Sequence, residues 1–562
     1  MAFVVDAYAA EQEGIGPAVG SIQFYNSQSG AELAERVVLV DSSFSEWTDS
    51  GWTTFTESAD TRKVYVSPTG NDASSGLSPA QAKRTLAAGI ALLRHGYPDW
   101  LLLERGGVWH ESLGHWVRSG RSADEPMLVS TYGSAPARPR LLTGLQHGIH
   151  TQGGSGTPPN IDYLALVGLE FVADLYAGAH LQVGARMLQP GTSFLIEDCL
   201  FRGYGVNLVF QGFGGRHSDF RLRRSVVVDS WALHSTGHSQ GLYAYAVDGL
   251  LIEDNVFDHN GWKEGVPGAG ADMFNHNLYI DNGNTGVVVR GNLIANAASH
   301  GMQLRPGGVC VNNLFVRNSI ALQVGGGNSP DPGGVTAEVH QNVILDGKNI
   351  DAVQPRGWAM WFANIVAGHV SDNVIANNVS GDSPLALGLD GTQVGDNAPS
   401  IGIHDLLLEN NIVHDWGGNL VVEGQYGQLS GITFQDNDVQ DLTHDHPLID
   451  QPSSGSVAAL SSSGNHFHSE LLSSNHWTKV GTTMYALGYW QSLVGDATSS
   501  AQQVEYFDPS RSPASYNGLL GGTPSLSAFL AQARLQSAAD WKPEYTAVHV
   551  NAYLRAGFEP AH

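Results

Sequence analysis

A short unit centred on asparagine recurs along residues 160–475 and limits what this chain can fold into. Each copy has a few apolar residues, then Asn or a similar residue, then two or three more apolar residues. Examples lie at 252–257, 289–294 and 311–315. Successive central asparagines are between 21 positions (292 to 313) and 38 positions (373 to 411) apart. A constant strand unit with inserts of variable length is typical of a solenoid with loops on its flanks.

The repeat predicts an all-β fold, a right-handed parallel β-helix. One turn is too small to bury its own apolar face, so successive turns stack around one continuous core. The repeated Asn fits a bend where its amide bonds to the Asn of the next coil and forms a ladder. A doubly wound sheet would need helical segments between the strands, and a propeller would need a period of about 40 to 45 residues.

Three parts follow from where this pattern begins and ends. Residues 1–60 are acidic, contain scattered aromatic residues and have no clear period, so we interpret them as an appended β-rich region or arm. Residues 61–475 form the solenoid with its N-terminal capping helix. Residues 476–562 change in pattern and are predicted to pack over the far end of the solenoid as a second cap.

Helices are expected only at the two ends of the solenoid. An amphipathic helix is predicted over 79–94, with Ser78 as its N-cap and Pro79 at its first position. Two more are predicted in the tail, over 525–535 and 546–556.

Composition excludes several classes of partner. The formal net charge of −26 argues against binding to nucleic acid or to an anionic membrane. No run of about 18 apolar residues occurs, so no membrane span is expected. Cys199 and Cys310 are the only cysteines, 111 positions apart. We expect both to be unpaired and buried, because a disulfide requires Cα atoms within about 7 Å.

Three stretches, at 240–245, 276–281 and 300–305, are copies of one alternating pattern. Side chains alternate between the two faces of a strand, so one face is apolar and the other is polar and aromatic. The apolar face consists of Leu242, Leu278, Ile280, Met302 and Leu304, and Leu322 is expected to continue it. The polar face consists of Tyr243, Tyr279 and Gln303 in one column and Tyr245, Asp281 and Arg305 in the next. We expect the chemistry of the protein on this polar face.

The start of the solenoid is similar in sequence pattern to known proteins. A strand at 63–66 runs into the turn-rich stretch 70–76 (GNDASSG). Together with the asparagine-centred coils, this segment resembles the pectate-lyase-like superfamily over residues 62–475. That superfamily includes polysaccharide lyases, uronate epimerases, glycosidases and phage tailspikes, so the resemblance is specific for the fold and not for one reaction. It implies that the helix near 79–94 covers the first edge of the sheets.

Enzymes that eliminate or epimerise uronate polymers need two kinds of group. A base removes the proton next to a carboxyl group, and a cation or donor holds that carboxyl while charge builds on it. Arg305 suits the second role because its guanidinium can bind a carboxylate through two parallel hydrogen bonds. The residues available for proton transfer beside it are Tyr243, Tyr245, Tyr279, His276 and His300, and Asp281 completes the predicted catalytic set.

Each of these assignments has a structural alternative. His276 and His300 have the parity of inward residues, so they are expected to be half buried at the strand starts, where one of them could serve the fold alone. Asp281 and Arg305 could form a simple ion pair between adjacent coils.

Two further groups are candidates for substrate binding. Arg221 and Arg223 belong to a cluster of five arginines within residues 202–224 of a very acidic chain, which indicates either an anion-facing surface or salt bridges to neighbouring carboxylates. Trp262 and Lys263 lie in a long insert that flanks the polar face, where Trp262 could stack on a sugar ring. Tyr245 and Gln303 complete the predicted binding set.

The sequence identifies no cofactor with certainty. A histidine metal site would consist of His234, His238, His259 and His276. These residues lack the close spacing that is typical of metal ligands, which favours separate polar residues instead. Ca²⁺ is the one ion left open as a cofactor.

Two classes of function remain. The first is an enzyme that cleaves an acidic, uronate-containing polysaccharide by β-elimination. Its hydrolytic variant would pair Asp281 with Asp272 or Glu264. The second is a non-catalytic glycan-binding protein, such as a virion fibre or an adhesin. No signal peptide is visible in residues 1–6 (MAFVVD). We therefore expect an extracellular protein whose leader is absent from this sequence, or a virion-surface protein that forms a homotrimer.

Overall fold

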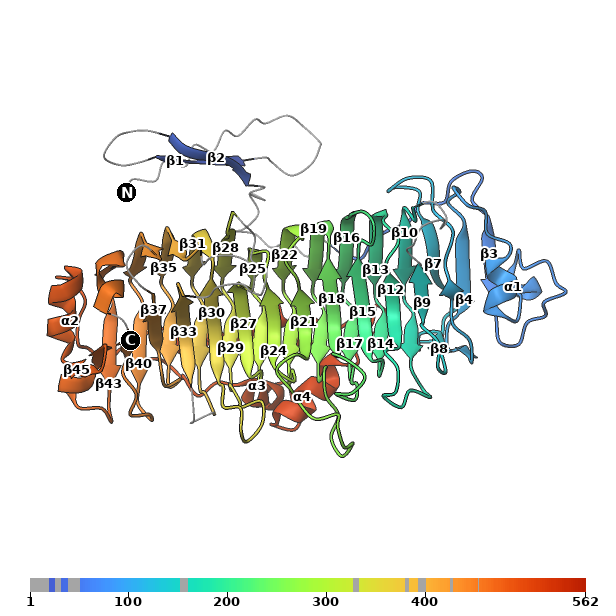
Figure 1. Cartoon of the computed structure of the whole chain (residues 1–562). Helices are drawn as coiled ribbons and strands as arrows, with labels where there is room; N and C mark the ends of the chain where they lie inside the picture. The colour runs from blue at the N-terminus through green and yellow to red at the C-terminus, as the bar shows by residue number, and fades with distance from the viewer. Residues whose placement is uncertain are drawn as a thin grey trace. The chain divides into compact units, whose positions relative to one another are not determined.

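The chain divides into two units, residues 1–55 and 56–562. The computed structural model describes residues 20–25, 32–38, 51–151, 160–326, 333–379, 384–392, 401–424, 428–452 and 454–561. In the first unit, β1 (Gly20–Tyr25) and β2 (Glu32–Val38) pair antiparallel (Figure 1). Most of the predicted 1–60 region lies outside the described residues.

The second unit is the predicted right-handed parallel β-helix, built from three long sheets of parallel strands (Figure 1). One coil consists of β19 (Val247–Glu253) in the first sheet, β20 (Val256–Asp258) in the second and β21 (His276–Ile280) in the third. The first sheet runs from β3 (Lys63–Val66) to β42 (Leu460–Ser463), and the second from β5 (Val108–Trp109) to β43 (His466–Ser469).

The third sheet carries the polar face predicted from the sequence. It consists in spatial order of β6 (Gly114–His115), β9 (Ile149–Thr151), β12 (Val183–Met187), β15 (Val206–Gln211), β18 (Gln240–Tyr245), β21, β24 (His300–Leu304), β27 (Ile320–Gly325), β30 (Trp358–Ala363), β33 (Leu385–Asp390), β37 (Leu420–Glu423), β41 (Ile449–Gln451), β44 (Thr478–Val480) and the antiparallel β45 (Thr483–Tyr485).

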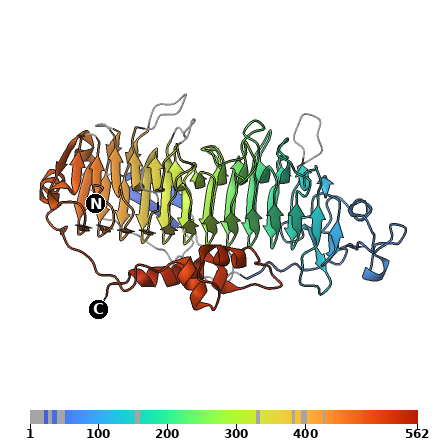
Figure 2. The same ribbon diagram turned by 90° about the horizontal axis from the view of Figure 1, so that it is seen from below.

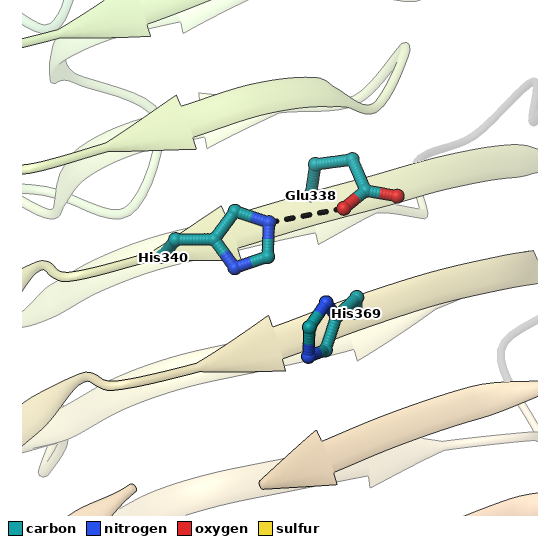
Figure 3. Close-up of side chains that lie close together, drawn as sticks. All are labelled: Glu338, His340 and His369. Carbon is teal, nitrogen blue, oxygen red and sulfur yellow. Dashed lines mark hydrogen bonds and ion pairs between the residues drawn. The ribbon is translucent and has the colours of Figure 1, made fainter. Parts of the chain in front are cut away.

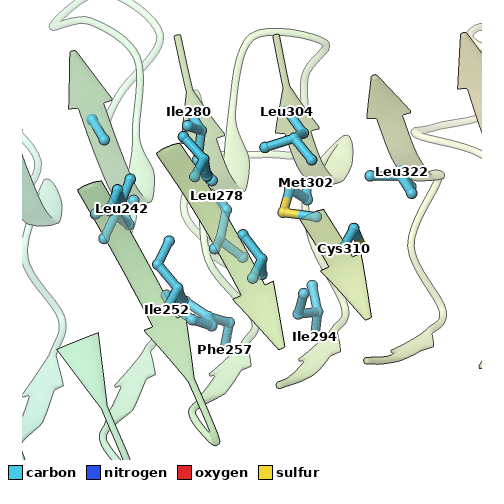
Figure 4. Close-up of a cluster of buried hydrophobic side chains, with 14 of the residues drawn as sticks. Leu242, Ile252, Phe257, Leu278, Ile280, Ile294, Met302, Leu304, Cys310 and Leu322 are labelled. Carbon is cyan, nitrogen blue, oxygen red and sulfur yellow. The ribbon is translucent and has the colours of Figure 1, made fainter. Parts of the chain in front are cut away.

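The core columns predicted for the third sheet are confirmed. Leu278 pairs with Met302, and Ile280 pairs with Leu304, on adjacent strands. These four side chains and Leu322 are fully buried in the shared core (Figure 4). Both cysteines are free and buried, as predicted.

The predicted asparagine ladder joins the coils at the bend between the first and second sheets. At each step the side-chain amide Nδ2 donates to Oδ1 of the next asparagine at 2.9–3.0 Å. The ladder consists of Asn255, Asn292, Asn313, Asn342, Asn373, Asn411, Asn437 and Asn465. It begins at Ser225, whose N–H donates to Asn255 Oδ1, and ends at the Ser499 hydroxyl.

The residue before each ladder asparagine makes the bend. It has a positive φ at every step, from 52° at Asn312 and Asp436 to 67° at Gly464. This left-handed conformation is easiest for Gly and is tolerated best by Asn and Asp among other residues. That preference accounts for the Asp, Asn and Gly residues that precede the ladder in the sequence.

The predicted helix over 79–94 is wrong in extent. The structure has a 3₁₀ turn at Pro79–Gln81 and a short α1 (Leu86–Ile90). Between them Lys83 pairs with the first strand, since its N–H donates to Tyr65 O at 2.9 Å and its carbonyl accepts from Ser67 at 2.8 Å. Ser78 makes no cap; Thr85 caps α1 by accepting from Ala88 N–H at 3.2 Å. The edge of the first strand therefore takes up the N–H and C=O groups of Lys83, which a continuous helix would need for its own hydrogen bonds.

The C-terminal tail covers a side of the solenoid as well as its end. At the last coils, β44 and β45 extend the third sheet and α2 (Leu487–Val494) packs against the final strands. The helices α3 (Pro513–Leu519), α4 (Leu526–Ala533) and α5 (Ala547–Arg555) lie along the second sheet (Figure 2). The last two match the predicted tail helices, but the prediction that the whole tail caps the far end is wrong.

The outer face of the second sheet explains this placement. Its short strands carry apolar residues on both faces, such as Val226 and Val228 outward and Val227 inward. The outward residues need a cover that excludes water. No helix in the described part of the chain is long and apolar enough to cross a membrane.

The ladder should contribute measurably to the free energy of unfolding. In Asn313→Ala, the N–H and Nδ2 of Asn292 lose their shared acceptor, and Asn342 Oδ1 loses its side-chain donor while it keeps the backbone N–H of residue 313. Each buried group left unpaired costs about 1–3 kcal/mol, so we expect a loss of about 3 kcal/mol in urea unfolding. The exposed Asn71→Ala, which loses one turn contact to Ala73, should cost about 0.5 kcal/mol. Equal losses in the two variants would contradict a stabilising ladder.

Candidate active site

The polar face of β18, β21 and β24 is assembled as predicted. Tyr243 pairs in register with Tyr279, and Tyr279 with Gln303, so one column runs across three coils. Their neighbours in sequence point into the core, and the alternation of the strand forces these side chains outward. The column continues to Gln323 and Trp361 on the next two strands.

An ion pair lies at the ends of these strands. Arg305 Nη1 is 3.3 Å from Asp281 Oδ1, and the Tyr243 hydroxyl donates to Asp281 Oδ2 at 3.1 Å. The Arg305 guanidinium lies 4.6 Å from the ring centroid of Tyr279, a cation–π contact. The side chains of Arg305 and Asp281 are 18% and 16% exposed, so solvent and a ligand can reach both. The ion pair expected as the structural alternative is therefore present, and it orients Arg305.

Both tyrosines keep their protons at neutral pH. Burial raises the pKa of Tyr279 to about 12, although the charge of Arg305 acts in the opposite direction. Burial and then the Asp281 carboxylate raise the pKa of Tyr243 further. These two hydroxyls are therefore hydrogen-bond donors.

The two histidines occupy the outer side of the strand starts, contrary to the parity argument. The ring centroid of His276 is 4.7 Å from that of His300 and 5.4 Å from that of outward Tyr279. The corner residue Asn277 breaks the alternation, because its buried amide turns inward to donate to Ala295 O at 2.8 Å. Both histidines are 3% exposed, so the expected half-burial is also wrong.

Burial keeps both imidazoles neutral. It lowers the pKa of His300 to about 3 and that of His276 well below its usual value, and the nearby positive charge of Arg305 adds to both shifts. His300 is held on both sides, by Ser299 Oγ at Nδ1 (2.9 Å) and by Gln303 Nε2 at Nε2 (3.2 Å). His276 is the freer base.

Three buried polar atoms in this cluster have no hydrogen-bond partner among the described residues. They are His276 Nδ1, Gln303 Oε1 and Arg305 Nε. Buried polar atoms in native proteins are nearly always paired with protein or water, and a catalytic role is one of the reasons for an exception. The cluster thus contains one acceptor or base, one amide oxygen and one cationic donor whose hydrogen-bonding capacity is not used within the described part of the protein.

A row of carboxylates farther along the same face was missed by the sequence analysis. Asp390 pairs in register with Glu423, and Asp450 lies on the following strand. Burial, then the charges of Asp390 and Asp450, raise the pKa of Glu423. Lys479 Nζ binds Asp450 at 2.8 Å. Asp390 and Glu423 occupy the second outward column, the slot of Tyr245, so extending the strand alignment beyond 305 would have found them.

The arginine cluster does not face this site. Arg221 and Arg223 lie on β16 (His217–Arg223) of the first sheet. Arg223 is buried between Glu197 (3.0 Å) and Glu253 (2.7 Å), and Arg221 binds Asp219 at 2.7 Å. The other three also pair with carboxylates; they are Arg202, Arg216 and Arg224. The salt-bridge alternative is therefore the one that the structure shows, with Arg221 paired inside its own strand and the other four arginines paired between neighbouring coils.

The insert after β20 is held to the corner between the second and third sheets. The indole N–H of Trp262 donates to Asn296 O at 2.9 Å, and Lys263 Nζ lies 4.3 Å from the ring centroid of Trp231. No contact between these two residues and the Arg305 cluster is seen in the described residues, so their role in binding stays a prediction.

The carboxylates proposed as partners of Asp281 are engaged elsewhere. Glu264 contacts His259 at 3.0 Å, and Asp272 lies 3.5 Å from His234. The histidine set weighed as a metal site does not come together within the described part of the chain, where the one metal-compatible group of three lies on the first sheet.

No protein-family model and no curated protein matches the chain. Among solved structures, a GH136 lacto-N-biosidase from Eubacterium ramulus is 14% identical, covers 78% of this chain and 67% of its own, and has a TM-score of 0.35. The complex structure of XylC with xylose is 11% identical, with 74% and 85% covered and a TM-score of 0.40. Pectate lyase Pel9A is 14% identical, with 79% of each chain covered and a TM-score of 0.30.

The lowered pKa of His300 predicts acid sensitivity. An unfolded histidine titrates near 6.5. The unfolded chain therefore binds more protons as pH falls below 6.5, and stability drops by up to about 1.4 kcal/mol per pH unit per buried histidine. His300→Gln should flatten the slope of urea stability between about pH 6.5 and 5, above the range in which most carboxylates titrate. The exposed His180→Gln is the control, and equal slopes in His300→Gln and wild type would refute the prediction.

Proposed function

We propose that this chain is a carbohydrate-active β-helix protein that cleaves an acidic, uronate-containing polysaccharide by β-elimination on the outer face of the third sheet. The observation that supports this most is the group of three unpartnered atoms, His276 Nδ1, Gln303 Oε1 and Arg305 Nε. β-Elimination at a uronate needs a neutral base and a fixed cation close together, and this group supplies both.

Each residue has a distinct part in the proposed reaction. Arg305 binds the uronate carboxyl and stabilises the charge that develops when the neighbouring C–H proton leaves. His276, kept neutral by burial, accepts that proton. Tyr279, protonated at neutral pH, donates a hydrogen bond or a proton to the departing glycosidic oxygen. Asp281 holds Arg305 in place, and Tyr243 holds Asp281.

The shape of the solenoid suits a polymeric substrate. Adjacent coils are about 4.8 Å apart, so a row of outward side chains forms an extended surface. Tyr245 is exposed beside the cluster, and Trp361 continues the column of Tyr279 and Gln303. Aromatic faces of this kind can pack against sugar rings.

Replacement of Arg305 tests the proposal. With a panel of uronate polymers, absorbance of new unsaturated chain ends should report turnover by the wild type. Arg305→Ala should lower kcat/KM by at least about 100-fold, since a lost transition-state donor costs about 3 kcal/mol. Arg305→Lys should also be poor, because a point charge cannot replace the planar fork, and Tyr279→Phe removes only the hydroxyl.

The control is an arginine on another sheet that, like Arg305, forms an ion pair with a carboxylate of a neighbouring coil. Arg140→Ala breaks an ion pair with Glu170 (3.0 Å) on the second sheet and should leave turnover unchanged. All variants should keep the circular dichroism of the wild type. Full turnover by Arg305→Ala would exclude this site, and binding without any product would make the chain a glycan-binding protein.

Hydrolysis is the second candidate, and the carboxylate row favours it. Coils about 4.8 Å apart place Asp390 and Glu423 near the separation of about 5–5.5 Å used by retaining glycosidases. The raised pKa of Glu423 suits a general acid, and Asp390 would be the second carboxyl group of the pair. In this case products carry new reducing ends without unsaturation.

Glu423→Gln separates the two reactions. If hydrolysis is the activity, this variant should lose about 10²–10⁴-fold in kcat, and wild-type activity should fall as pH rises through the raised pKa of Glu423. The exposed Glu470→Gln, which loses one contact with His468, is the control. Full reducing-end production by Glu423→Gln would rule out the row as the hydrolytic centre.

A further inference from the structure

A second cluster of chemically capable side chains lies on the outer face of the first sheet. Glu338 and His340 are two positions apart on β28 (Val335–His340), so they share one face. His369 lies on the next strand, β31 (Ile365–Ser371), directly in register with Glu338. One potential ligand atom from each of the three lies within 4.8 Å of the other two (Figure 3).

A neighbouring hydroxyl fixes the ring of His340. Ser371 Oγ lies 3.0 Å from His340 Nδ1 and donates its own proton to the Asp372 carboxylate at 3.0 Å. The hydroxyl must therefore accept from His340 Nδ1–H. This leaves Nε2 as the ring nitrogen that faces Glu338 Oε2, 3.0 Å away. A cation between this nitrogen and the carboxylate would satisfy both.

The ring of His369 is fixed in a similar way. Its Nε2–H donates to Glu409 Oε1 at 2.8 Å, and Gln435 Nε2 donates to the other oxygen of Glu409 at 2.7 Å. Nδ1 is then the nitrogen with a free lone pair. The two imidazole centroids are 4.9 Å apart. Metal-bound histidines in proteins typically donate their other N–H to such an outer acceptor.

We propose that Glu338, His340 and His369 form a binding site for a divalent transition-metal ion of the Zn²⁺ type. Two imidazole nitrogens and one carboxylate oxygen are a common ligand set for Zn²⁺, with a fourth position open to water. Ca²⁺ and Mg²⁺ prefer six or more oxygen ligands, which this set does not offer. Tetrahedral ligands about 2.1 Å from Zn²⁺ lie roughly 3.4 Å apart, so closing this cluster requires only side-chain adjustment.

Other histidine–carboxylate pairs of the chain differ from this cluster. His466 binds Asp438 at 2.7 Å, for example, but Asp438 is also bound by the Tyr506 hydroxyl. Among the described residues, only the Glu338 cluster places one ligand atom from each of three groups within 4.8 Å of one another. Its members are partly exposed, which gives an ion a path of entry.

A metal at this position would join two coils. Glu338 and His340 come from one coil and His369 from the next, so the ion would add a cross-link parallel to the hydrogen bonds of the first sheet. Binding to the folded chain alone would raise its thermal midpoint. The site lies on a different sheet from the Arg305 cluster and does not depend on the proposed reaction.

The test is metal binding by the full chain without a polyhistidine tag. After chelation and dialysis, titration with Zn²⁺ should show one tight equivalent and a rise in the thermal midpoint, and Co²⁺ should give the visible absorption of a four-coordinate site. His340→Ala and His369→Ala should each weaken Zn²⁺ binding by at least about 100-fold, and Glu409→Gln, which frees the His369 ring, by about 10-fold to 100-fold.

Controls keep the result interpretable. His466→Ala removes a histidine–carboxylate pair elsewhere and should bind Zn²⁺ as the wild type does. Circular dichroism of each metal-free variant checks the fold, and Glu338→Gln, a nearly isosteric change, provides a ligand variant least prone to misfolding. The proposal is overturned if wild type binds no Zn²⁺, if Glu338→Gln and both histidine variants bind it equally well, or if Ca²⁺ displaces it at equal concentration.

Discussion

The stacking of coils along the asparagine ladder is the constraint on which the rest of this structure depends. No coil can bury its own apolar face, so each needs a neighbour in a defined register. The ladder supplies that register, because each Asn amide bonds to the next at 2.9–3.0 Å at a buried corner. A left-handed residue before each asparagine turns the chain from the first sheet into the second.

Because the coils are in register, residues that recur periodically in the sequence form columns of side chains on the surface. On the third sheet it aligns Tyr243, Tyr279 and Gln303 on adjacent coils, and it brings Asp281 next to Arg305. A buried polar atom without a partner costs about 1–3 kcal/mol, so three of them in one cluster are a local burden on stability. The rigid stack tolerates this cost in stability and holds these groups in fixed positions relative to one another.

The outer faces of the three sheets share one backbone arrangement but differ in the side chains that they carry. The second sheet is apolar outside and is covered by α3, α4 and α5. The first sheet carries charges that satisfy one another between coils, as Arg223 does between Glu197 and Glu253. Its histidine–carboxylate cluster follows the same principle with groups that also suit a metal. The third sheet keeps polar groups that are not fully satisfied, which is why the proposed reaction is placed there.

The sequence by itself determined the repeat, the core columns through Leu278 and Leu304, and the ladder, because period-two alternation and one recurring bend residue are local properties that stacking only multiplies. Most of the predicted polar face follows from the same alternation. Only the tertiary structure decided which way His276 turns, since a buried Asn277 at the corner breaks the alternation there. It also decided that the arginines meet carboxylates and that the tail helices cover the second sheet. Those outcomes depend on which distant segments meet, and inserts of variable length hide that register from the sequence.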